Sequence, residues 1–192
     1  MKLYSVKVFV LSALVILPLN VTAEIAIPEQ ALHEARSLVK TFGSHLKASL
    51  KPAIQSGGPV NAINVCNLQA EKIAEAVSVK SNWQVGRTSL KARNANNTPD
   101  VWELKNLLKF EQRKAAGEDV STIEYSELVA QDGQSVYRYM KAIPTAGLCL
   151  KCHGSQLDND VSAKLKELYP YDQAVNFKEG DIRGAFSLYK VL

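Results

Sequence analysis

Apolar residues recur every three or four positions after Pro28, and this spacing predicts an amphipathic helix. Its apolar positions are Leu32, Ala35, Val39, Phe42, Leu46, Leu50 and Ala53. The run Gly57-Gly58-Pro59 interrupts the pattern. The pattern then resumes, with Asn61 as a suitable cap, at Ile63, Cys66, Ala70, Ile73, Ala74 and Val77. The sequence therefore predicts two N-terminal helices and places Cys66 on the inward face of the second.

Alternation of apolar and polar residues predicts strands in four later segments. These segments are 83–93, 122–130, 134–143 and 182–191. The second and third are separated by Asp132-Gly133, which suits the positive φ of a tight hairpin turn. In the first segment, Arg87 and Arg93 fall on the same face as Trp83. Cations on such a face need anions opposite them, unless the strand is a solvated edge of the sheet.

Two more helices are predicted between the strands. One has Thr98 as its cap and Pro99 as its first residue, and it continues to about Gly117. The other spans residues 159–169 and is stopped by Pro170. This order of elements predicts one α+β domain over residues 24–192, in which helices flank an antiparallel sheet. The connection 171–180 has no pattern that indicates its structure.

The first 23 residues have the pattern of a secretory signal peptide. Lys2 and Lys7 give a positive start, residues 8–19 are almost wholly apolar, and small residues precede a cleavage position after Ala23. We therefore expect an exported, periplasmic protein. The apolar run is shorter than the ~20 residues that a spanning helix needs, so contact with a membrane is expected only if this segment is retained as an anchor.

Charge excludes one class of partner. Without residues 1–23 the chain has 169 residues, of which 21 are basic and 19 acidic. A nucleic-acid-binding domain would be expected to carry a much stronger basic excess. We therefore predict no nucleic-acid partner, and the balance is too even to indicate an acidic protein partner.

The pentapeptide Cys149-Leu150-Lys151-Cys152-His153 carries the most specific chemistry in the chain. Two thiols at this spacing can each add to one vinyl group of the same porphyrin, and the following histidine can then bind the iron. The pattern predicts covalent attachment of one haem c through Cys149 and Cys152, with His153 as an axial ligand. Zinc is a weaker alternative because it needs four ligands. A redox dithiol would leave His153 without a role.

The second axial ligand has four candidates. His33 is predicted to lie on the polar face of the first helix and His45 at the edge of its apolar stripe. Met140 is close to the pentapeptide, although a methionine on a strand usually packs in a core. Cys66 is the third of three cysteines and has no disulfide partner once the thioethers have formed. From the residues alone, an axial thiolate and a small buried side chain are equally good interpretations of Cys66.

Several short segments together resemble a family of small exported c-type haem proteins with a PAS-like fold. That family is typified by a cyanobacterial haem protein and was formerly catalogued as a domain of unknown function. The segments are Gly86–Lys91, Arg93-Asn94, Asn97, Pro99-Asp100, Trp102-Glu103, Cys149–Gly154, Tyr169-Pro170 and Gly180–Ala185. The resemblance covers about residues 28–191. It departs from the family pattern at Asn94-Ala95, where the family usually has Asn-Pro.

This resemblance implies a PAS-like antiparallel sheet and one haem c with His153 and Cys66 as axial ligands. Separately from the resemblance, the cost of placing Arg87 and Arg93 on the face of Trp83 leads to the hypothesis that they pair with the haem propionates, the alternative being a solvated edge of the sheet. Because two protein ligands leave no open iron position, we expect electron transfer or redox sensing with a redox partner that the sequence does not identify, rather than catalysis. The alternative is a gas or ligand sensor, or a haem enzyme, in which the sixth ligand dissociates.

Overall fold

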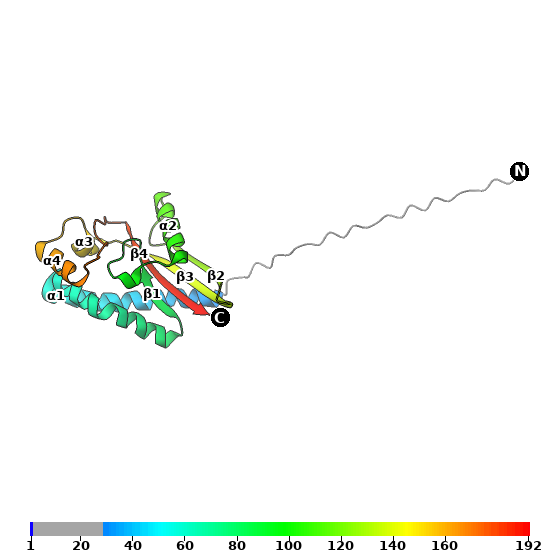
Figure 1. The fold of residues 1–192 in the computed structure, drawn as a ribbon, viewed down its shortest axis with the longest axis horizontal. Coiled ribbons are helices and arrows are strands. Elements are labelled where there is room, and N and C mark those ends of the chain that lie inside the picture. The colour runs from blue at the N-terminus through cyan, green and yellow to red at the C-terminus, as the bar shows by residue number, and fades with distance from the viewer. Residues whose placement is uncertain (2–28) are drawn as a thin grey trace.

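The computed structural model describes Met1 and residues 29–192, so the predicted signal peptide lies outside the described residues apart from Met1. The helices are α1 (Glu29–Ser81), α2 (Val101–Ala115), α3 (Leu150–His153) and α4 (Asn159–Leu168), with 3₁₀ turns η1 (Ala95–Asn97) and η2 (Gly147–Cys149). The strands are β1 (Gln84–Thr88), β2 (Glu124–Gln131), β3 (Gln134–Pro144) and β4 (Ile182–Val191). Figure 1 shows α1 and α2 beside the sheet and α3 and α4 together at one end of it.

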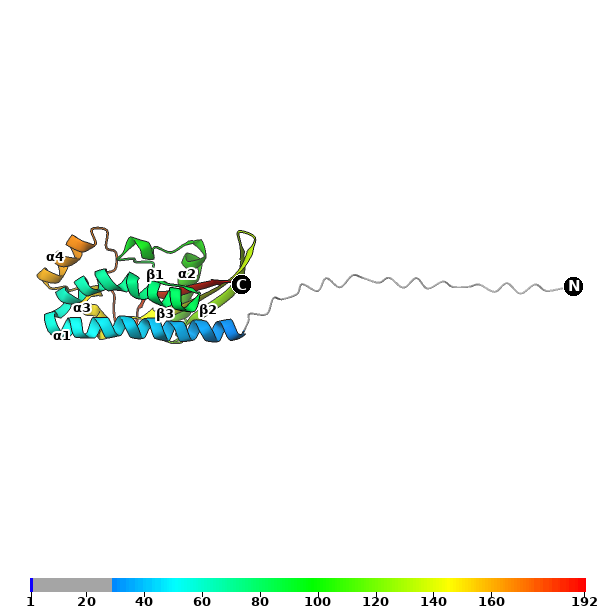
Figure 2. The same ribbon diagram turned by 90° about the horizontal axis from the view of Figure 1, so that it is seen from below.

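Helix α1 is a hairpin of two helical arms. Gly57 and Gly58 are non-helical, and the φ of +67° and ψ of −164° at Gly58 are suited to glycine. The second arm therefore runs back along the first (Figure 2). The prediction of two helices is confirmed, but Asn61 is not a cap. Its side-chain amide instead donates to the carbonyl oxygen of Ala53, 3.0 Å away, and so ties the two arms together.

The four strands form one antiparallel sheet in the order β1-β4-β3-β2. Strands β2 and β3 make the predicted hairpin, with positive φ at Asp132 (51°) and Gly133 (75°). Strand β4 lies between β3 and β1, so that Leu188 is opposite both Tyr139 and Val85. The predicted α+β class, with an antiparallel sheet flanked by helices, is confirmed.

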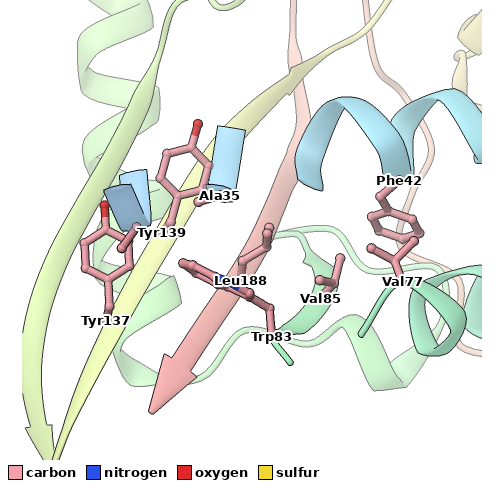
Figure 3. Close-up of a cluster of buried hydrophobic side chains, with 9 residues drawn as sticks. Ala35, Phe42, Val77, Trp83, Val85, Tyr137, Tyr139 and Leu188 are labelled. Carbon is pink, nitrogen blue, oxygen red and sulfur yellow. The ribbon is translucent and has the colours of Figure 1, made fainter. Parts of the chain in front are cut away.

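Each face of the sheet is covered by a different helix. The α1 hairpin covers one face, where Phe42 and Val77 pack with Trp83 and Leu188. Figure 3 shows these side chains in one layer between α1 and the strands. Helix α2 covers the other face, where Phe110 packs with residues that include Met140. No helix among the described residues has the length and apolar character needed to cross a membrane.

Two of the predicted boundaries were wrong for reasons that the structure shows. Strand β1 ends at Thr88 rather than at residue 93, because Ser89 turns the chain by accepting a hydrogen bond from the backbone of Lys91. Helix α2 begins after Asp100 rather than after Thr98. Asp100 and Glu103 form a reciprocal capping box, in which each side chain accepts a hydrogen bond from the backbone N–H of the other residue. Thr98 is therefore not needed as a cap.

Strands β1 and β4 approach closely at Gly184, and we predict that Gly184→Ala destabilises the protein. Its φ is +154°, and a Cβ there would collide with the Thr88 carbonyl oxygen. We expect a loss of about 1–3 kcal/mol in the free energy of unfolding, measured by urea denaturation. Gly86→Ala is the matched control, because its Cβ would lie 3.8 Å from the Ser187 carbonyl oxygen, an ordinary contact. Equal stability of the two variants would contradict the prediction.

Candidate functional site

A cavity of about 280 Å³ lies between the α1 hairpin, the sheet, and the segment that contains the pentapeptide. Its apolar lining includes Phe42, Leu50, Ile54, Ala62, Ile63, Ala70, Ala74, Ile143 and Leu148. Its polar and reactive lining includes Cys66, Asn67, Glu71, Arg87, Arg93, Cys149, Cys152, His153, Tyr169 and Arg183. All six residues predicted from the sequence to form the site therefore line one cavity. Its volume is close to the lower end of the ~300–1,000 Å³ range of small-molecule sites.

The pentapeptide follows β3 directly, as predicted. Cys149 ends η2, and α3 carries Cys152 and His153 to the cavity wall. Gly154 closes this helical turn, and its N–H donates to the Leu150 carbonyl oxygen at 2.9 Å. A Cβ at Gly154 would lie 2.6 Å from the same oxygen. The glycine after the histidine is thus required by crowding.

The His153 ring has a fixed orientation. Its Nδ1 lies 2.8 Å from the Ala174 carbonyl oxygen, which can only accept, so Nδ1 carries the proton and Nε2 keeps its lone pair. Burial, followed by the charges of Arg183 and Arg93, holds the pKa of His153 well below its ordinary value. A neutral imidazole whose Nε2 carries a lone pair is the form that binds a metal.

The connection 171–180, which the sequence left unexplained, forms the support behind this histidine. The N–H of Phe177 donates to the His153 carbonyl oxygen at 2.9 Å, and the N–H of Asn176 donates to that of Gly154 at 3.1 Å. Asp172 accepts from the N–H of Ala174 at 2.7 Å, so it holds the carbonyl that orients the ring. No periodicity reveals such a segment, because its backbone pairs with residues about twenty positions away.

Arg93 lies outside the strand where the sequence placed it, and it joins the pentapeptide to this support. Its Nε forms an ion pair with Asp172 at 2.9 Å, and both side chains are largely buried. Its other donors reach the carbonyl oxygens of Cys152 at 2.6 Å and Ala174 at 3.1 Å. These contacts make Arg93 a positioning residue and engage its Nε and Nη2, whereas its Nη1 has no hydrogen-bond partner among the described residues. The pairing of Arg93 with a propionate therefore stays a prediction.

Arg87 differs from Arg93. It lies on β1 on the face that Val85 shares, as predicted, and its guanidinium carbon is 5.9 Å from the centre of the Phe42 ring. Within residues 29–192 it forms no ion pair. Burial lowers the pKa of Arg87, which is the cost of holding a guanidinium away from water. An anion in the cavity would offset this cost.

Arg183 is a site residue to which sequence reasoning assigned no role. Its Nε donates to His153 Nε2 at 3.4 Å, and its Nη1 donates to Ser89 Oγ at 3.1 Å. It also forms no ion pair within the described part of the chain. Burial, followed by the charges of Arg93 and Arg87, lowers the pKa of Arg183 to about 10. Arg183 is the second residue of β4, and its place within the segment Gly180–Ala185 was the only available signal.

Cys66 lies on the second arm of α1. It is not a small side chain packed in the core, which was one of the two interpretations that the sequence left open. Its side chain is exposed, and the exposed surface contributes to the cavity wall. The surrounding cavity wall partly removes the thiol from bulk water, and this desolvation raises its pKa, although the charges of Arg87 and Arg93 act in the opposite direction. The helix face was therefore predicted correctly, but it faces the cavity that contains His153 rather than other apolar side chains.

The other candidate axial ligands lie elsewhere. His33 and His45 are exposed on α1 and do not line the cavity. Met140 is fully buried with α2 on the opposite face of the sheet. Among residues 29–192, no three His, Cys, Asp or Glu side chains are grouped as a metal site would require, so the zinc alternative gains no support.

Comparison with known proteins gives one family and one similar structure. The model of the family described as Tll0287-like matches residues 24–190. A solved structure described as "Crystal structure of the cyanobacterial heme-protein Tll0287" is similar, with a TM-score of 0.64 and 22% identity. The match covers 84% of this chain and 95% of that one. No curated protein matches the chain.

The buried pair of Arg93 and Asp172 generates a prediction about stability. Asp172→Ala leaves the guanidinium buried without its carboxylate and frees the N–H of Ala174. We expect a loss of about 3 kcal/mol in the free energy of unfolding, measured by urea denaturation. Asp158→Ala is the control, since Asp158 is exposed and its side chain makes no capping bond. A similar small loss in both variants would show that the pair is not a structural support.

Proposed function

This chain belongs to the Tll0287-like family, whose model covers residues 24–190, and we propose that it is an exported c-type haem protein that transfers or senses electrons. In this proposal residues 1–23 are a signal peptide cleaved after Ala23, and the folded protein is periplasmic. One haem is bound through thioethers to Cys149 and Cys152. The similar cyanobacterial protein is described as a heme-protein.

One observation carries the proposal: the two thiols of the pentapeptide, the imidazole and a third thiol all line the same cavity. The donors fit a haem iron, because His153 presents a neutral Nε2 and Cys66 lies on a separate element. The apolar lining suits a porphyrin. Arg87 and Arg183, which lack ion pairs among the described residues, suit its propionates.

Haem iron would supply one-electron redox chemistry, and the chain determines the potential and the access to it. Thiolate ligation favours the ferric state. The charges of Arg87 and Arg93 make the Cys66 thiolate less unfavourable, whereas burial favours the protonated thiol. The Nδ1 hydrogen bond to Ala174 fixes the tautomer and the orientation of the His153 ring, with Nε2 left to bind an iron.

The ligand assignment predicts a difference between Cys66→Ser and the wild type. Both proteins, exported alongside haem-maturation machinery, should gain the mass of one haem, because the attaching thiols are unchanged. The absorption spectrum of the iron should change in Cys66→Ser, since a thiolate ligand is lost. Cys149→Ser and Cys152→Ser should each lose one thioether.

Two results would contradict this assignment. An iron spectrum that is unchanged in Cys66→Ser would move the axial ligand to another side chain. A colourless, haem-free product after correct maturation would exclude the whole proposal. Carbon monoxide added to the reduced protein tests the alternative in which Cys66 dissociates from the iron. An immediate spectral change would favour a ligand sensor or enzyme over an electron-transfer protein.

The position of Arg87 in the cavity leads to a prediction about the reduction potential of the Arg87→Ala variant. A fixed cation near the iron stabilises the reduced form, which carries one positive charge less, so Arg87→Ala should lower the potential. We expect a shift of roughly 30–60 mV, measured by spectroelectrochemical titration. A shift of about 59 mV corresponds to a tenfold change in the equilibrium constant of a one-electron couple. Lys72→Ala is the control, because Lys72 is exposed on α1. A haem-loaded Arg87→Ala protein with unchanged potential and stability would contradict the role in propionate pairing.

A further inference from the structure

Arg183 makes a contact that ligation of an iron by His153 would exclude. Its Nε donates to His153 Nε2 at 3.4 Å. Because Nδ1 of the same ring is engaged with the Ala174 carbonyl oxygen, Nε2 is the atom left to bind an iron. The single lone pair of Nε2 can accept a hydrogen bond or bind a metal, but not both. The structure therefore shows His153 with its ligating atom capped by a guanidinium.

Only neutral groups hold the Arg183 guanidinium in this position. Besides the contact with His153, its Nη1 donates to Ser89 Oγ at 3.1 Å and to the Lys91 carbonyl oxygen at 3.3 Å. Arg183 forms no ion pair within residues 29–192. A guanidinium binds a carboxylate more strongly than it binds a neutral acceptor. A carboxylate in the cavity would therefore draw this guanidinium away from its present partners.

The other two arginines of the cavity are not placed to cap the histidine. Arg93 is held by its ion pair with Asp172 at 2.9 Å. Arg87 has no ion pair among the described residues, but it makes no contact with the imidazole there either. In the described part of the chain, only Arg183 donates a side-chain hydrogen bond to the ring of His153. Its role is therefore different from simple pairing with an anion.

We propose that Arg183 is a positioning residue that caps His153 Nε2 in the haem-free protein and exchanges this contact for a haem propionate. The inference rests on the proposed function, because the exchange needs a porphyrin with carboxylates in the cavity. Both side chains line that cavity. The exchange makes Nε2 available when a carboxylate is present to receive the guanidinium. Arg183 thereby couples recognition of the propionates to formation of the bond between iron and histidine.

The cap is tested in the full chain prepared without haem-maturation machinery. Diethyl pyrocarbonate acylates the unprotonated nitrogen of an imidazole, and mass spectrometry of peptides gives the rate at each histidine. His33 and His45 are exposed on α1 and serve as internal standards in the same sample. Relative to these standards, His153 should react about fivefold faster in Arg183→Ala than in the wild type, because one hydrogen bond to Nε2 is lost.

Two further variants separate the contact from its surroundings. Arg183→Met keeps most of the side-chain length without the donors, so His153 should react as fast as in Arg183→Ala. Arg87→Ala also removes a guanidinium from the cavity wall but leaves the contact with His153 intact, so its rate should equal that of the wild type. Loss of charge cannot explain a faster reaction, since removal of a cation favours the protonated imidazole, which does not react.

The exchange is tested with ferric haemin and its dimethyl ester, which keeps the porphyrin and the iron but has no carboxylates. Absorption titrations in the same detergent give the affinity of the haem-free chain for each. The wild type should bind haemin at least about tenfold more tightly than the ester. Arg183→Ala should bind the ester about fivefold more tightly than the wild type does, because the cap no longer has to be displaced. Arg87→Ala should weaken haemin binding and leave ester binding unchanged.

Two results would overturn the inference alone. Equal acylation of His153 in the wild type and in Arg183→Ala or Arg183→Met would show that Nε2 is not capped. Ester binding that is unchanged or weaker in Arg183→Ala would make Arg183 an ordinary propionate partner without an exchange. A third result, a chain that binds neither porphyrin and gains no haem when exported with maturation machinery, would contradict the proposed function and the exchange with it.

Discussion

The guanidinium groups of Arg87, Arg93 and Arg183 line one cavity. Of these three, only Arg93 forms an ion pair with another described residue. Burying a cation without an anion is unfavourable, so this arrangement constrains the rest of the site. Burial lowers the pKa of both Arg87 and Arg183. Such a cavity favours an anionic occupant and opposes protonation of His153. Burial raises the pKa of the Cys66 thiol, and the charges of Arg87 and Arg93 offset part of this effect.

The fold brings these groups together from distant parts of the sequence. Cys66 comes from the returning arm of α1, Arg87 from β1 and Arg183 from the start of β4. Gly58 allows the arm to return, and the antiparallel pairing of β1 with β4 sets the two strands side by side. The pentapeptide enters from β3 at the same end of the sheet. The site is therefore a consequence of the sheet order and of one glycine break in a helix.

Local signals in the sequence identified much of this correctly. The Asp132-Gly133 turn, the break at Gly57-Gly58 and the pentapeptide each depend on residues that are adjacent in the chain. The predictions from the sequence were wrong where contacts between residues far apart in the chain determine the structure. Strand β1 ends early because Ser89 turns the chain, and the support of His153 consists of backbone bonds from residues 172–177. No periodic pattern encodes a carbonyl oxygen such as that of Ala174, and Arg183 gave no local sign that its guanidinium approaches His153.

The hydrogen bonds between Ser89 and Arg183 give the crowding at Gly184 a consequence beyond stability. Ser89 Oγ donates to the Arg183 carbonyl oxygen at 2.8 Å and accepts from the Arg183 guanidinium at 3.1 Å. The position of this guanidinium is therefore tied to the close approach of β1 and β4. Because Arg183 contacts both His153 and Phe177, its side chain links the two strands to the histidine. A glycine at position 184 keeps the strands close enough for this contact, so the same residue fixes the sheet and the charge next to the imidazole.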